Sequence, residues 1–179
     1  MTPSAAELVR GAAAGLRSAR FARICQYTVG AGGEHTSLSR GQVDFATGIA
    51  DLELPALRGE GGPAMVVLRP PRGYLRRADG SWMPLPVSSE DVSESLRSLE
   101  SEALVATERE ETGKARAFDV CVEVEDAQRL RGTVWLGNEY LIKLEQPGKS
   151  ARIAGVEFTA IGEPLALLSV PEHVTAWRP

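Results

Sequence analysis

Few side chains in this sequence could carry out acid–base or nucleophilic chemistry. There are two histidines, His35 in a glycine-rich loop and His173 after a proline near the C-terminus. A loop histidine can serve as a base or a metal ligand, but the pattern around each favours a solvated or structural role. No nucleophile elbow, zinc-protease helix or phosphate loop occurs. Residues 30–33 fail the dinucleotide fingerprint because His35 occupies the third glycine position, so we interpret them as a turn.

The cysteines and the acidic runs give no stronger signal. Cys25 and Cys121 are too few for a disulfide framework and lack the spacing of a zinc or redox motif, so we expect two unbonded strand thiols. Glu108, Glu110 and Glu111 precede a turn and are interpreted as a solvated run. No two acids are placed in a shared apolar pocket, as acid–base catalysis requires. The sequence therefore predicts no metal and no cofactor, and it leaves catalytic residues unassigned.

A basic stretch, Arg69, Arg72, Arg76 and Arg77, is interleaved with prolines and Tyr74. It could steer an anionic headgroup or carboxylate toward the mouth of a cavity. It could equally be a solvated edge hairpin, because charges on edge strands suppress aggregation of sheets. Several aromatic residues also fall on proposed strands, where they either fill the core or line a pocket: Tyr27, Tyr74, Trp82, Trp135, Tyr140 and Phe158.

Length and composition indicate one ordinary globular domain over residues 1–179. The net charge of -4 and the pI near 5.3 argue against a nucleic-acid partner. No apolar run approaches the roughly 18 residues that a membrane span needs, so we expect no stable membrane insertion. Arginines at positions 10, 17, 20 and 23 interrupt any signal-peptide core. We therefore expect a cytoplasmic protein or, alternatively, an envelope protein whose export signal has been removed.

The elements predicted by periodicity are mostly strands. A first helix runs from Ser4 to about Arg20, with a Ser4–Glu7 capping box, Leu8, Ala12 and Leu16 on one face, and Gly11 and Gly15 in close contact with a sheet. Strands follow at 23–29, 38–47, 50–54 and 64–68, with Asp51 and Glu53 on a wet face. The hairpin 73–85 turns at Asp79-Gly80, which suits a type I′ turn.

A second helix is predicted from Ser88 to Ala103. Ser88 with Asp91 forms its capping box, Val87 and Val92 a hydrophobic staple, and Val92, Leu96, Leu99 and Ala103 its apolar stripe. Residues 111–114 are predicted to turn into a strand whose apolar positions, 118 to 124, alternate with Asp119, Cys121 and Glu123. Gly137-Asn138 joins two more strands, and the last strand covers about 152–161. Consecutive hairpins of this kind form meanders, sandwiches or barrels.

This order of elements resembles the LolA/LppX group of bacterial envelope lipid carriers. The matching stretches are residues 40–54, Gly73–Arg76 with Gly80–Leu85, Thr133–Leu136, and the ending around Phe158, Gly162-Glu163-Pro164 and Val174. The resemblance implies a mainly β (α+β) fold, a single curved antiparallel sheet or half-open barrel with an N-terminal helix and a second helix on the concave face. It further implies a greasy cavity for a lipid, an acyl chain or a similar hydrophobic molecule.

The residues expected to bind that ligand are Trp82, Tyr74, Trp135, Tyr140, Leu96, Leu99, Arg72 and Arg76. Because side chains alternate, Trp82 and Met83 point to opposite faces, and we predict that Trp82 enters the cavity. Two other functions stay open at this point. One is a cytoplasmic pocket-template enzyme, a cyclase that folds a polyketide-like substrate into a reactive conformer. The other is an interaction module whose groove accepts a partner peptide or a lipoprotein tail.

Overall fold

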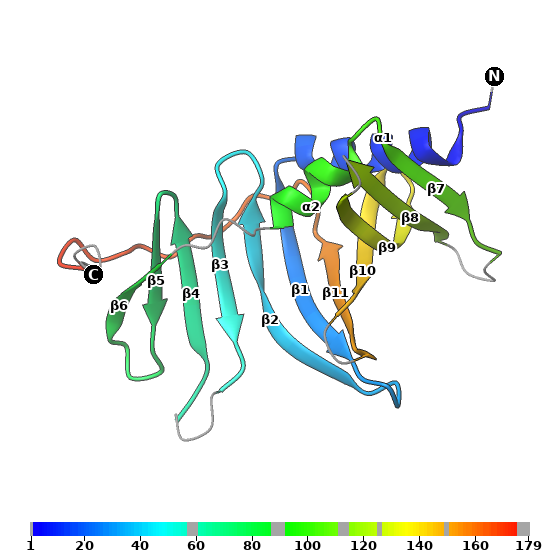
Figure 1. Ribbon diagram of the computed structural model, residues 1–179. Helices are drawn as coiled ribbons and strands as arrows, with labels where there is room; N and C mark the ends of the chain where they lie inside the picture. The colour runs from blue at the N-terminus through cyan, green and yellow to red at the C-terminus, as the bar shows by residue number, and fades with distance from the viewer. Residues whose placement is uncertain are drawn as a thin grey trace.

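A single curved antiparallel sheet dominates the computed structural model, which describes residues 2–56, 61–86, 92–110, 115–124, 127–148 and 151–174. Eleven strands follow the order β6-β5-β4-β3-β2-β1-β11-β10-β9-β8-β7, so β6 and β7 are its two open edges. Figure 1 shows the sheet curling around two helices, α1 (Ala5–Ser18) and α2 (Val92–Leu99). The predicted mainly β fold with two helices is confirmed. The strands are β1 (Phe21–Val29), β2 (His35–Asp44), β3 (Ile49–Leu54), β4 (Ala64–Arg69), β5 (Arg72–Arg76), β6 (Trp82–Leu85), β7 (Leu104–Glu108), β8 (Arg116–Val124), β9 (Ala127–Gly137), β10 (Tyr140–Pro147) and β11 (Ile153–Thr159).

The topology explains why α2 lies over the sheet. Strands β1–β6 and β7–β11 form two meanders, and β1 pairs with β11 in the middle of the sheet, with Ile24 opposite Phe158. Because β6 and β7 are the two edges, the chain between them has to cross the sheet, and α2 lies on that crossing. Leu96 and Leu99 of α2 are fully buried in the main core, as predicted.

Helix α1 begins as the sequence predicts. The Ser4 N–H donates to the Glu7 carboxylate at 2.6 Å, and the Glu7 N–H donates to the Ser4 hydroxyl at 3.3 Å, which completes the capping box. Its buried face is Val9, Ala12, Ala13 and Leu16, whereas Leu8 is only half-buried. Neither helix of the described residues is long and apolar enough to cross a bilayer.

The two glycines of α1 behave differently. A Cβ at Gly15 would lie 3.0 Å from the Glu139 carbonyl oxygen and 3.5 Å from the Tyr140 ring, which confirms its predicted close contact. The same prediction is wrong for Gly11, which is exposed and has no neighbour within 4 Å of a built Cβ.

Helix α2 is shorter than predicted. It ends at Leu99 rather than Ala103, and Ala103 is exposed in a turn. The Ser101 hydroxyl accepts the Ala103 N–H at 3.2 Å, a local bond by which serine competes with helix continuation. The predicted capping box and staple at 87–91, like the predicted turn at 111–114, lie outside the described residues.

The connection from α1 to β1 is held by an ion pair. Arg20 has a φ of 71°, an uncommon value for a residue with a side chain. Its guanidinium donates to both oxygens of Asp44 at 2.9–3.2 Å, and Asp44 is 3% exposed. Burial alone would raise the pKa of Asp44, but hydrogen bonds from Arg20, Thr47 and the Ala46 N–H outweigh it and lower that pKa.

The predicted hairpin at 73–85 is confirmed in part. The β5–β6 hairpin turns at Asp79-Gly80, but the type I′ geometry is wrong because Gly80 has a positive φ of 84° and Asp79 does not. Along β8, Phe118, Val120 and Val122 are buried as predicted. Both cysteines are free, and β1 and β8 are separated by three strands.

Candidate functional site

The strands β3–β6 turn an entirely apolar row of side chains toward the helix side of the sheet. Strand register places Leu52, Val66, Leu75 and Met83 in one row across the four strands, and Ala50, Leu68, Gly73 and Leu85 in the next. Ala50 and Leu52 belong to the main core around α1 and α2, so this face is continuous with the concave side. We call the apolar residues of this face the helix-side wall: Ala50, Leu52, Leu54, Ala64, Val66, Leu68, Gly73, Leu75, Met83 and Leu85.

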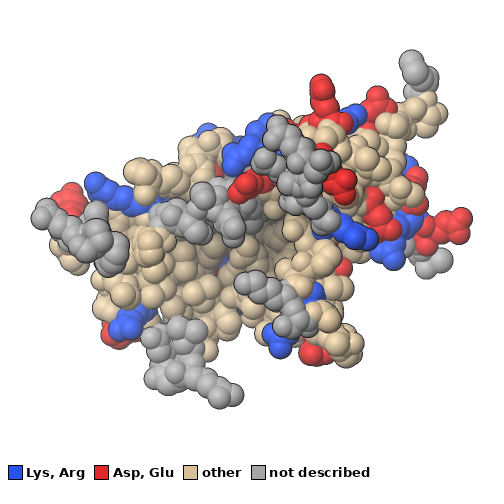
Figure 2. Space-filling model, viewed as in Figure 1, with Lys and Arg blue, Asp and Glu red and all other residues tan. Residues whose placement is uncertain are grey.

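Much of this wall lies beyond the protein's own core. Leu54, Val66, Leu75, Met83 and Leu85 belong to neither hydrophobic cluster of the described residues, and Met83 is 41% exposed. The other four are half-buried. Figure 2, which looks onto this side, shows mainly uncharged atoms over β3–β5, with charged side chains toward the ends of the strands. The wall therefore offers an apolar surface without a charged group.

The outer face of the same strands is covered by the C-terminal segment 162–174, which we call the strap. Val67 and Tyr74 point outward and form a second cluster with Val174, joined by Met65, Trp82, Leu168 and Val170. Strand β4 thus carries the unbroken run Ala-Met-Val-Val-Leu, a pattern typical of strands that are buried on both faces. The strap supplies the cover on one face of β4 only.

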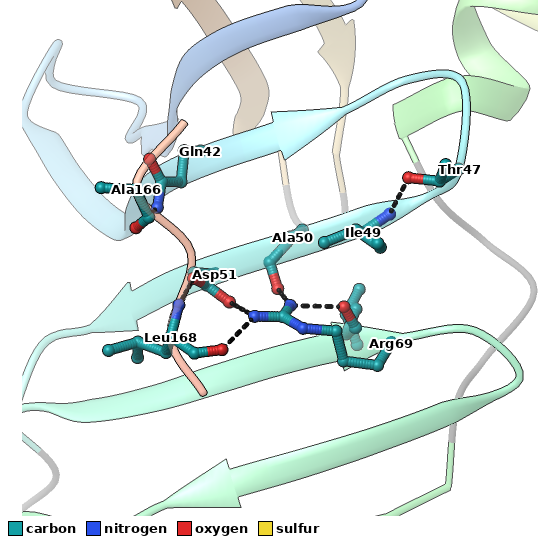
Figure 3. A network of polar contacts seen from close by, with 9 residues as sticks. Gln42, Thr47, Ile49, Ala50, Asp51, Arg69, Ala166 and Leu168 are labelled. Carbon is teal, nitrogen blue, oxygen red and sulfur yellow. Dashed lines mark hydrogen bonds and ion pairs between the residues drawn. The ribbon is translucent and has the colours of Figure 1, made fainter. Parts of the chain in front are cut away.

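A buried ion pair fixes the strap to the sheet, as Figure 3 shows. Arg69 Nη2 lies 2.8 Å from Asp51 Oδ1, and Asp51 is 2% exposed. The Leu168 N–H donates to Asp51 Oδ2 at 2.7 Å, and Arg69 donates to the Leu168 carbonyl oxygen at 2.8 Å. Arg69 also donates to the carbonyl oxygens of Ala50 and Leu68, and Gln42 donates to that of Ala166. The prediction that Asp51 lies on a wet face is wrong, because the strap covers it.

Trp82 and Tyr74 lie on the outer face rather than on the concave side. Tyr74 is opposite Val67 and Pro84, and Trp82 is opposite Arg76, all of which point away from α2. Both aromatics pack in the cluster under the strap. The prediction that Trp82 enters a concave cavity is therefore wrong, and Met83 is the residue of that pair on the wall.

The other predicted binding residues are dispersed. Leu96 and Leu99 are on the concave side but have no exposed surface. Tyr140 packs on α1 beside Gly15. Trp135 is on the outer face, where the Lys143 ammonium lies 4.3 Å from its ring centroid. Arg72 and Arg76 are exposed on the outer face of β5 and so do not border the wall directly.

A polar cluster on the outer face was missed by the sequence analysis. The hydroxyl of Tyr27 donates to Glu145 at 2.7 Å, and Lys143 lies 2.9 Å from the same oxygen. Burial and the bond to Glu145 raise the pKa of the Tyr27 phenol well above its usual range. Burial would raise the pKa of Glu145, but the bonds from Tyr27 and Lys143 lower it. A carboxylate held ionised beside a phenol held protonated is a poor acid–base pair, so the cluster braces the sheet.

The described residues hold no group of three or more His, Cys, Asp or Glu side chains that could bind a metal. His35 is exposed, lies at the start of β2 and stacks on Tyr27 at 5.3 Å; His173 is exposed on the strap. Two hollows of about 690 and 620 Å³ lie on the outer face, and both mix charged with apolar residues. The predicted apolar cavity of a half-open barrel stays a prediction; on the concave side the described residues present an open wall.

Comparison with known proteins identifies the fold. No protein-family model matches the sequence, and no curated protein matches it in sequence. The structure matches LprF from Mycobacterium bovis with a TM-score of 0.61 at 9% identity, over 94% of this chain and 97% of that one. It matches the Mycobacterium tuberculosis lipoprotein LppX with a TM-score of 0.64 at 14% identity, over 93% and 100%. The resemblance to the LolA/LppX group is confirmed for the fold, and these matches give no support to a cytoplasmic location.

Proposed function

We propose that the protein binds a hydrophobic ligand, a lipid or another molecule with a long acyl chain, against the helix-side wall. One observation carries the proposal: the helix-side wall across β3–β6 is apolar, and β4 is apolar on both faces, yet among the described residues the strap covers only the outer face. Leaving such a face in water is unfavourable, because each buried Å² of apolar surface contributes roughly 25 cal/mol. An apolar ligand would supply the missing cover.

The chemistry of the wall supports a long alkyl group rather than a polar one. Its side chains are aliphatic or methionine, with no donor or acceptor to fix a polar group in place. Covering several half-exposed Leu, Val and Met side chains would contribute on the order of 5–10 kcal/mol before the entropic cost of binding. Recognition would then depend on apolar area and shape.

The likeness to LppX supports the same reading. LppX is a lipoprotein, and the match covers 93% of this chain. On this ground we also propose that the protein acts in the cell envelope. The pocket-template enzyme is less well supported, because holding a substrate in a reactive conformer requires an enclosing pocket, whereas the described residues of the wall form an open surface. A lipoprotein tail would also present acyl chains, so a partner lipoprotein is a variant of the proposed ligand.

Native mass spectrometry of gently purified protein, followed by organic extraction, tests the proposal. We expect a mass adduct that survives gentle ionisation and an extract containing an acyl lipid. A polycyclic or polyene small molecule in the extract would favour the enzyme instead. Protein that is free of adducts and takes up no added fatty acid would contradict the proposal.

A further inference from the structure

The β5–β6 edge of the sheet is basic in an acidic protein. Residues 61–86 hold four arginines and one acidic residue, Asp79, so this segment carries +3. The whole chain carries -4, which leaves -7 for the remainder. Including Glu172 of the strap and Asp51, which is paired with Arg69, reduces the charge at this edge to +1 and leaves -5 for the remainder. Such separation of charge gives one end of the molecule a field opposite to that of the rest.

Two of these arginines are available for a partner. Arg72 and Arg76 are exposed on the outer face of β5, on either side of Tyr74, and neither has an acidic partner among the described residues. The nearest acid along the row of Arg76, two strands away, is Glu53, and it is already paired with Arg40 at 2.6 Å. By contrast, Arg69 is already paired with Asp51.

Apolar groups accompany the charges at the same edge. Trp82 is half-buried directly opposite Arg76, and Met83, 41% exposed, is the next residue. A half-exposed tryptophan beside basic residues is the combination found where proteins meet the headgroup region of a bilayer. The edge strand β6 contains Pro84, which cannot donate a ladder hydrogen bond, so the edge is poorly suited to adding a strand from another protein.

We propose that the β5–β6 edge docks on an anionic lipid bilayer surface through Arg72, Arg76 and Trp82. The same edge carries Met83 at the end of the helix-side wall, so docking would bring the open side of the wall next to the membrane. A lipid could then pass between bilayer and wall without crossing water. Only this last consequence rests on the proposed function.

Vesicle flotation tests the docking surface directly. Vesicles of phosphatidylcholine with phosphatidylglycerol are compared with pure phosphatidylcholine, using the parent protein, the variant Arg72→Gln/Arg76→Gln and the control Arg131→Gln/Arg152→Gln. The control removes the same charge from two exposed sites away from the β5–β6 edge, Arg131 on β9 and Arg152 directly before β11. Each basic residue near an anionic surface contributes roughly fivefold in affinity, so the first variant should lose about 25-fold and the control little. Raising the salt concentration should release the parent protein.

The proposal would be overturned if the parent protein does not bind anionic vesicles. It would also be overturned if the control variant loses as much vesicle affinity as the Arg72/Arg76 variant. Equal binding to neutral vesicles would overturn it as well. A fatty-acid titration of the same variants separates this proposal from the proposed function. Because Arg72 and Arg76 point away from the wall, the titration should be unchanged where vesicle binding is lost.

Discussion

Replacing Asp51 with alanine should loosen the strap and lower the free energy of unfolding by about 2–3 kcal/mol. Removing one partner of a buried ion pair usually costs roughly 3–5 kcal/mol, because the other charge is left uncompensated. Here Arg69 keeps its bonds to the carbonyl oxygens of Ala50, Leu68 and Leu168, and its side chain is 21% exposed. These contacts lower the expected cost.

The assay is guanidinium unfolding followed by far-ultraviolet circular dichroism, with limited proteolysis of the strap as a second readout. Glu53→Ala is a matched control on the same face of β3. Its ion pair with Arg40 is far more open, with side chains 34% and 73% exposed, so it should cost less than about 1 kcal/mol. Pairing Asp51→Leu with Arg69→Met should recover part of the loss.

Two results would refute this reasoning. One is an Asp51→Ala variant no less stable than the Glu53→Ala control. The other is a strap that is cleaved no faster in the Asp51→Ala variant than in the parent protein. Either would mean that the apolar contacts of Leu168, Val170 and Val174 hold the strap without the ion pair.

Three further predictions test the fold and the site. Gly11→Ala should raise thermal stability by about 0.5–1 kcal/mol, and Gly15→Ala should not, because its Cβ would lie 3.0 Å from a carbonyl oxygen. The lowered pKa of Asp44 means that its stabilisation is present above about pH 4 and is lost as pH falls through the folded-state pKa. Asp44→Asn should therefore be less stable than the parent at pH 7, with the gap closing in acid-denaturation curves. Trp82→Ala should leave fatty-acid binding within about twofold, measured by titration, since Trp82 is on the outer face.

Local patterns in the sequence predicted most of the elements, though not β7, and the wall positions of β3. The alternation of Ala50, Leu52 and Leu54 with polar residues assigned the dry face of β3 correctly, and the Ser4–Glu7 spacing located the start of α1. These features depend on neighbours a few residues apart, so the sequence alone carries them.

The errors arose where distant segments meet. The pattern of β3 predicts that Asp51 is solvated, because no residue near it in sequence indicates that Leu168 covers it. The prediction that Trp82 points to the concave side is wrong for the same reason, because the strap covers the outer face on which Trp82 lies. The unbroken apolar run of β4 held the missing signal. Such a run predicts cover on both faces, and prolines and apolar residues from Pro164 onward could have suggested the strap.

The most direct test of ligand binding at the helix-side wall is a titration with a fluorescent long-chain fatty acid. The variants are Val66→Ser, at the centre of the wall between Leu52 and Leu75, and Val105→Ser, 66% exposed on the outer face of β7. Both changes replace valine with serine, and thermal unfolding checks that both variants are folded. Val66→Ser should weaken binding by about 1–2 kcal/mol, roughly 5–30-fold, while Val105→Ser stays near the parent. Equal affinities in all three folded proteins would contradict ligand binding at this wall.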